Sequence, residues 1–94
     1  MLYILLCRDK PDNESLRLAN RERHLAWVGT KRDQIHLAGP LLSDDGEHMI
    51  GSVFILEADT ADAVRAFNRD DPYTQAGLWG SVDMHPFRQV IPAP

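Results

Sequence analysis

Two short runs of the chain are apolar at nearly every position, and they constrain the fold more than any other feature of the sequence. One run is "LYILLC", residues 2 to 7, and the other is "SVFILEA", residues 52 to 58. Because the side chains of a strand point alternately to the two faces of a sheet, a sheet built on these runs is apolar on both faces. Both faces then need a cover, since large apolar patches rarely stay in contact with water.

The remaining sequence predicts two further strands and two helices. Strands are expected at residues 2–8, 35–43, 49–58 and 78–90, and helices at residues 14–33 and 59–70. Asp12 or Asn13 is expected to cap the first helix, and Asp59 or Thr60 the second. On the first helix, Leu18, Leu25 and Val28 recur at helical spacing and are expected to face the sheet.

The order β-α-β-β-α-β predicts a ferredoxin-like α+β fold, in which a four-stranded antiparallel sheet carries both helices on one face. The first and third strands are then central and the second and fourth are edges. Pro40 and Pro86 fall in the predicted edge strands, where a missing backbone N–H is tolerated. Residues 1–94 are expected to form a single domain.

Two helices cover only one face of this sheet, so the other face needs a partner. The simplest partner is a second copy of the chain, related by a twofold axis. We therefore expect a homodimer through the open sheet face. Tyr3, Leu5 and Phe54 are expected among the residues buried between the two sheets.

Charge and cysteine content exclude several classes of function. The formal net charge is −4, with 14 acidic and 10 basic side chains well mixed along the chain. This pattern argues against nucleic acid and against an anionic membrane surface as partners. The single cysteine, Cys7, lies in an apolar run and is expected to be a small buried hydrophobe. We expect a cytoplasmic protein, because the apolar opening lacks the other parts of a secretion signal.

No metal or organic cofactor is expected. The histidines at positions 24, 36, 48 and 85 do not pair with one another, with Cys7 or with a carboxylate at a recognisable ligand spacing. The sequence also contains no phosphate-binding glycine loop and no Gly-x-Ser-x-Gly motif.

A polar ridge on the first helix is the first candidate for a functional site. Arg17, Asn20, Arg21 and His24 are linked by three- and four-residue steps, which places them along one side of the helix. Such a ridge is either a solvated face or one wall of a site.

The end of the second helix brings a carboxylate toward this ridge. Asp71 there is either the cap of a short turn begun by Pro72 or the partner of His24. A carboxylate fixes the tautomer of a histidine and supports its charged form, so the pair would make a general acid–base unit. Tyr73 either lines the same pocket or packs under the turn.

Three segments of the chain resemble the YciI-like family, whose members carry the YCII-related domain. These are Arg-x-x-His-Leu at residues 21–25, Ala-Gly-Pro at residues 38–40, and Asp-Pro-Tyr-x-x-Ala-Gly at residues 71–77. The resemblance covers nearly the whole chain. It implies a dimeric α+β barrel and a relationship to muconolactone isomerases. It also implies an active site with a His–Asp pair, here His24 and Asp71.

Two functions follow as alternatives. The first is a cofactor-independent enzyme, an isomerase or a lyase such as a dehalogenase, acting on a carboxylated lactone or an enol acid. His24 would then be the base or acid, with Arg17 or Arg21 holding a substrate carboxylate and Ser52 adding a hydrogen bond. The second is a non-catalytic dimer that binds a small acidic metabolite. His24 held within hydrogen-bond reach of Asp71 favours the enzyme.

Overall fold

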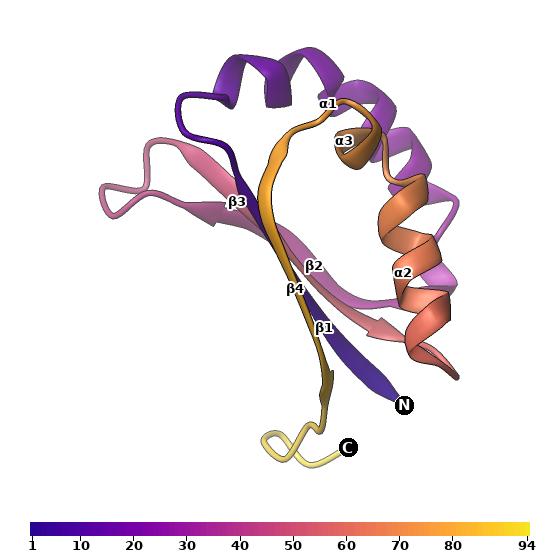
Figure 1. Cartoon of the computed structure of the whole chain (residues 1–94). Helices are drawn as coiled ribbons and strands as arrows, with labels where there is room; N and C mark the ends of the chain where they lie inside the picture. Colours follow the sequence, from indigo (N-terminus) through magenta and orange to yellow (C-terminus); the bar gives the residue numbers. More distant parts are fainter.

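The computed structural model describes residues 1–94 and contains one sheet and three α-helices (Figure 1). In chain order the elements are β1 (Leu2–Asp9), α1 (Glu14–Gly29), a 3-10 turn η1 (Arg32–Gln34), β2 (Ile35–Leu42), β3 (Met49–Glu57), α2 (Ala61–Asp70), α3 (Pro72–Gln75) and β4 (Trp79–Phe87).

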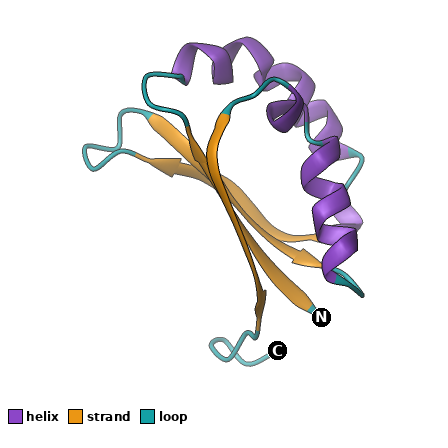
Figure 2. Cartoon of the chain, in the orientation of Figure 1, coloured by secondary structure: helices purple, strands orange, loops and turns teal.

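The sheet confirms the predicted ferredoxin-like arrangement. Its strand order is β2-β3-β1-β4, and every neighbouring pair is antiparallel. Figure 2 shows the helices together on one side of the strands. Pro40 and Pro86 lie in the edge strands β2 and β4, where a residue without a backbone N–H is tolerated.

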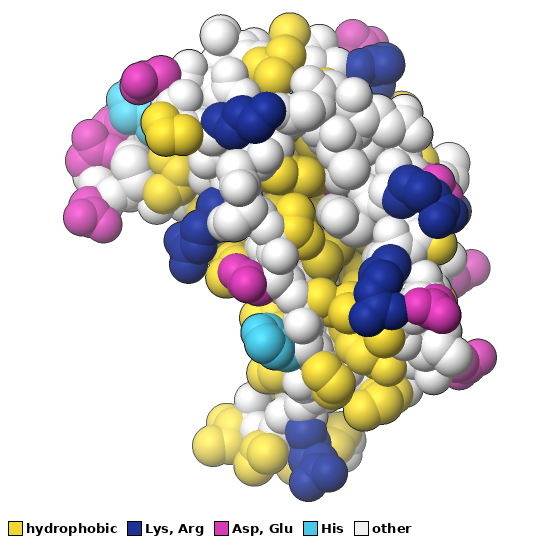
Figure 3. Space-filling view, viewed as in Figure 1, with side chains coloured by type: hydrophobic (Ala, Val, Ile, Leu, Met, Phe, Trp, Pro, Cys, Tyr) yellow, Lys and Arg dark blue, Asp and Glu magenta, His cyan; other side chains and the backbone are white.

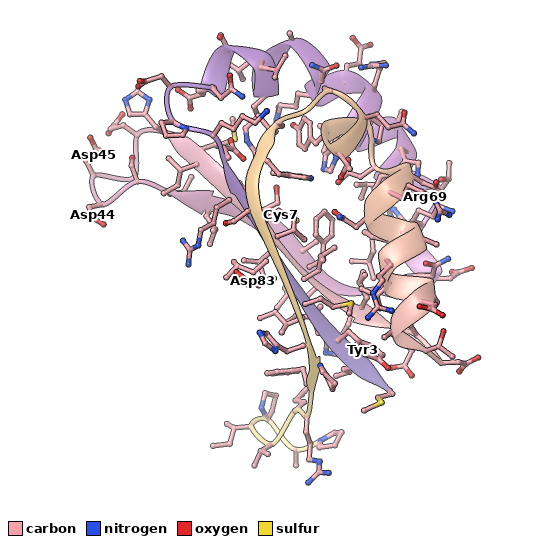
Figure 4. The ribbon with its side chains drawn as sticks, viewed as in Figure 1. Tyr3, Cys7, Asp44, Asp45, Arg69 and Asp83 are labelled. Carbon is pink, nitrogen blue, oxygen red and sulfur yellow. The ribbon has the colours of Figure 1, made fainter.

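The hydrophobic core lies between the helices and the central strands. Its buried residues are Tyr3, Leu5, Cys7, Phe54, Leu56, Val64 and Phe67. Figure 4 shows Tyr3 and Cys7 on the helix side of β1 and Asp83 on the other side of the sheet. The expectation that Tyr3, Leu5 and Phe54 lie between two sheets is therefore wrong. Alternation separates the two faces of a strand, but it does not say which face the helices cover.

The opposite face of the sheet is also largely apolar, apart from Asp83 and His85 of β4, and no element of the chain covers it. Ile4 pairs with Ile55, Leu6 with Val53, and Leu2 with Phe87 on this face. Leu37, which pairs with Ile55 from the edge strand, is 63% exposed. We call the surface formed by Leu2, Ile4, Leu6, Leu37, Val53, Ile55 and Phe87 the open face.

Helix α1 differs from its prediction in length and in orientation. It ends at Gly29 and is followed by the 3-10 turn, because glycine is a poor helix former and the backbone N–H groups of Thr30 and Lys31 bond back to the carbonyl oxygens of Trp27 and Val28, respectively. The residues of α1 buried against the protein are Arg17, Asn20 and His24. Leu18 and Leu25, which were expected to face the sheet, are 56% and 50% exposed. Three residues of the polar ridge, Arg17, Asn20 and His24, therefore form the inward side of α1, whereas Arg21 is exposed.

The structure also tests the predictions made for the helix caps, for Cys7 and for the last strand. Thr60 caps α2 by accepting a hydrogen bond from the backbone N–H of Ala63 at 3.2 Å. Asn13 occupies the position before α1, without a side-chain cap. Cys7 is fully buried, and its burial is the main reason why the pKa of its thiol is raised to about 12. The last strand is shorter than predicted and ends at Phe87.

The surface carries mixed charge. On the face seen in Figure 3, basic and acidic side chains are interspersed over the helices, and acidic side chains gather at the hairpin between β2 and β3. None of the helices is both long enough and apolar enough to cross a membrane.

Gly51 provides a test of how closely the strands pack. A Cβ atom at this position would lie 2.5 Å from the carbonyl oxygen of Cys7 and 2.8 Å from Cδ1 of Leu41. We expect Gly51→Ala to lower the free energy of unfolding by about 1–3 kcal/mol, because the backbone of β1 must move. Gly29→Ala is the control, since nothing lies within 4 Å of its Cβ position. Urea unfolding at one protein concentration measures both, and equal stability of the two variants would contradict the described packing.

Candidate active site

A cavity of about 140 Å3 lies between α1 and the half of the sheet formed by β2 and β3. Its polar wall consists of Arg17, Arg21, His24, Ser52 and Tyr73, and the rest of the wall is mostly apolar. The structure thus brings all the predicted substrate-binding residues to one cavity, together with His24. Asp71 lies behind His24, to which it is hydrogen-bonded.

Two larger hollows lie elsewhere on the surface. One, of about 630 Å3, is bounded by the two ends of the chain, and one, of about 540 Å3, lies between the β1–α1 loop and the β2–β3 hairpin. Among the residues that line either hollow, only Asp9 has a buried side chain, and that carboxylate is bonded to Arg17 of the smaller cavity. Around the smaller cavity Arg17, His24 and Ser52 are all buried. Polar groups held out of water in a cavity are the more informative sign of a functional site.

His24 and Asp71 form a buried pair at this cavity. The distance from Nδ1 of His24 to Oδ1 of Asp71 is 2.8 Å, and the two side chains are only 9% and 1% exposed. A carboxylate accepts hydrogen bonds, so Nδ1 is the nitrogen that carries the hydrogen. The other ring nitrogen, Nε2, is then left for a ligand in the cavity that His24 lines.

Asp71 has both of the roles that the sequence left open. It is the N-cap of α3, with Pro72 at the first helical position, and its Oδ1 accepts the backbone N–H of Tyr73 at 2.9 Å. The same oxygen accepts the hydrogen bond from His24. The second oxygen, Oδ2, is buried and has no hydrogen-bond partner in the protein. The cap therefore fixes the position of the carboxylate that orients His24.

Tyr73 packs against His24 and also lines the cavity. The two rings are stacked, with centroids 3.9 Å apart and an angle of 10° between their planes. The Trp79 ring packs edge-on against the Tyr73 ring, with the two centroids 5.7 Å apart. Burial raises the pKa of the Tyr73 hydroxyl, although the charges of Arg17 and Arg21 act in the opposite direction. Both readings of Tyr73 that the sequence allowed are therefore realised together.

Arg17 is held by an ion pair that the sequence did not predict. Its Nε and Nη2 donate to the two carboxylate oxygens of Asp9, each at 2.8 Å, and Nη2 also donates to Oγ of Ser52 at 3.1 Å. Burial acts to lower the pKa of Arg17, but the hydrogen bonds and charge of Asp9 outweigh it, and that pKa is raised. The guanidinium also lies over the ring of Tyr73, with Cζ 4.8 Å from its centroid.

Asp9 and Trp79 are the residues that sequence reasoning missed. Asp9 ends β1 and precedes a proline-containing loop, which resembles any polar strand end. Trp79 opens β4, pairs with Asp9 in the sheet, and donates its indole N–H to Oγ1 of Thr74 at 2.7 Å. No local spacing links either residue to Arg17 or Tyr73. The structure has no group of three or more His, Cys, Asp or Glu side chains arranged to hold a metal ion.

Comparisons with known proteins show the family to which the chain is similar. The family model for the YCII-related domain matches residues 1–88. Protein YciI of Escherichia coli O6:H1 is 34% identical over 98 residues, which cover 97% of this chain and all of that protein. An uncharacterised protein of Haemophilus influenzae is 32% identical over the same shares of the two chains.

One solved structure is similar in both sequence and fold. It is the 5-chloro-2-hydroxyhydroquinone dehydrochlorinase TftG of Burkholderia phenoliruptrix AC1100, in complex with 2,5-dihydroxybenzoquinone. It superposes with a TM-score of 0.88 at 31% identity over 96% of each chain. The sequence resemblance is thereby confirmed, and the chain belongs to the family of YCII-related domain proteins.

Proposed function

We propose that this protein is a cofactor-independent enzyme that moves a proton on a small cyclic substrate, with His24 as the general base or acid. The observation that carries the proposal is the buried 2.8 Å hydrogen bond between His24 and Asp71 beside a ligand-sized cavity. Similarity to a dehydrochlorinase supports a small-molecule enzyme of this family.

The chemistry begins with a proton on a carbon next to a carbonyl group. His24 accepts that proton at Nε2 and becomes an imidazolium, which the carboxylate of Asp71 stabilises. The electron pair left on the substrate either takes up a proton at another carbon, which is isomerisation, or expels chloride from the neighbouring carbon, which is elimination. In both reactions the bonds and charges balance without a redox partner.

The other polar side chains of the cavity have supporting roles in this proposal. Ser52 and Tyr73, which line the cavity, would hydrogen-bond a substrate oxygen. Arg17 or Arg21 supplies positive charge for an acidic substrate, such as a carboxylated lactone or an enol acid. The wall is otherwise largely apolar, which suits a ring.

Turnover by two variants tests the proposal. With 5-chloro-2-hydroxyhydroquinone and a panel of chlorinated lactones, we expect chloride release by the wild type. His24→Gln should lower the rate by about 10²–10⁴-fold, the usual contribution of a general acid or base. Asp71→Asn should also lower the rate while it keeps the fold, because asparagine is a good N-cap. His48→Gln is the control, since His48 is exposed on the hairpin.

Two outcomes would contradict the proposal that the protein is an enzyme. One is wild-type turnover in His24→Gln. The other is a wild-type protein that binds these rings but neither releases chloride nor exchanges a carbon-bound proton with deuterated solvent. The second outcome would support the non-catalytic binding protein instead.

We infer that a second copy of the chain covers the open face. Self-association across a twofold axis brings the same apolar residues of both copies together, with Leu37 at 63% exposed among them. The expected buried area exceeds about 1,000 Å2 in total, the size of a stable interface.

A charge placed on the open face tests the dimer. In light scattering at micromolar concentration, we expect a dimer for the wild type and a monomer for Leu37→Glu. Leu18→Glu is the matched control, because Leu18 is similarly exposed at 56% but lies on α1. A wild-type monomer, or a Leu37→Glu protein that remains dimeric, would exclude this interface.

A further inference from the structure

The two arginines of the cavity differ in what neutralises them. Arg17 is 2% exposed and binds Asp9 through two hydrogen bonds. Arg21 is exposed, lines the same cavity one helical turn further along α1, and forms no ion pair. An exposed residue on the wall of a cavity lies at its mouth. The mouth therefore carries a free cation, whereas the inner wall carries a paired one.

The two carboxylates nearest the cavity are each bonded to another side chain. Asp71 faces His24, just as Asp9 faces Arg17, and neither carboxylate forms part of the cavity wall. The charge of Arg21 acts on groups within the cavity. Together with the charge of Arg17 it lowers the pKa of Tyr73, against the effect of burial, which raises it. Arg21 is thus the cation at this site whose charge no neighbouring carboxylate balances.

The size and lining of the cavity limit the rest of the ligand. A volume of about 140 Å3 is close to that of the engineered apolar protein cavity of about 150 Å3 that holds one benzene molecule. Leu25, Val28, Pro40 and Phe54 supply apolar wall around it. A single ring fits this description, with hydrogen-bonding groups toward His24 and Ser52.

We propose that Arg21 is a specificity-determining residue that selects ring ligands carrying an anionic substituent at the cavity mouth. Arg17, neutralised by Asp9, instead holds Ser52 and Tyr73 in place and contributes little to anion selection. The substrate class is then a single-ring monoanion whose carboxylate points outward and whose reacting carbon lies at His24. This assignment of the substrate rests on the proposed function, but the selection of anions by Arg21 does not require turnover.

Equilibrium binding of benzoate and of its neutral analogue benzamide tests this assignment at fixed ionic strength. NMR titration or calorimetry with the full chain yields the ratio of the two dissociation constants. We expect the wild type to prefer benzoate, and Arg21→Gln to reduce that preference about tenfold, as for the loss of a charge-assisted hydrogen bond. Arg23→Gln is the matched control, because it removes the same charge from α1 at a residue outside the cavity wall.

A second variant separates the roles of the two arginines. Asp9→Asn leaves Arg17 without a neutralising charge, so we expect the preference for benzoate to rise. Loss of a structural contact alone would weaken both ligands and would not raise the ratio. If Asp9→Asn does not fold, Arg21→Gln still decides, because Arg21 is exposed and its replacement leaves the core intact.

The assignment is wrong if the wild type does not distinguish benzoate from benzamide, or if Arg21→Gln keeps the full preference. It is also wrong if Arg23→Gln lowers the preference as much as Arg21→Gln does, since the effect would then reflect net charge. Because the measurement is binding without turnover, it can succeed where the enzyme proposal fails, and the reverse.

Discussion

The structure depends on pairing the polar side chains that α1 turns inward. A helix of a small α+β protein ordinarily buries its leucines, yet here Arg17, Asn20 and His24 are buried and Leu18 and Leu25 are exposed. Burying such groups is unfavourable unless each finds a partner. Asp9 and Asp71 supply partners for Arg17 and His24 from outside the helix, whereas Asn20 forms its hydrogen bonds within α1. Removing one member of a buried ion pair typically costs about 3–5 kcal/mol.

This arrangement ties the fold to the candidate site. Asp71 begins α3 and orients His24 with the same oxygen, so the turn between α2 and β4 and the candidate base are fixed together. Tyr73, the second residue of α3, stacks on His24 and lies against Arg17. A short segment thereby connects both buried pairs. A connection between a helix and a strand needs no such side chains, which is the reason to attribute them to function.

Much of the fold could be predicted from the sequence because it follows from local patterns. Turn residues and apolar runs located the strands, and Pro40 and Pro86 identified the edges. The inward face of α1 could not be predicted, because its partners are distant in sequence; His24 and Asp71 are 47 residues apart. A polar ridge looks solvated until those partners are known. His24 and Asp71 were candidates from the polar ridge and the end of the second helix, and the family resemblance pointed to the same pair, whereas Asp9 offered no signal of either kind.

The position of the hydrogen on the His24 ring tests the central claim most directly. Long-range proton–nitrogen NMR correlations of the ¹⁵N-labelled protein show which ring nitrogens carry hydrogen, and the other three histidines report whether a variant keeps its fold. A hydrogen bond to Asp71 requires a hydrogen on Nδ1 of His24. We expect that hydrogen in the wild type, and its loss from Nδ1 of the neutral ring in Asp71→Ala. A wild-type His24 with no hydrogen on Nδ1 would contradict the pair and the acid–base role built on it.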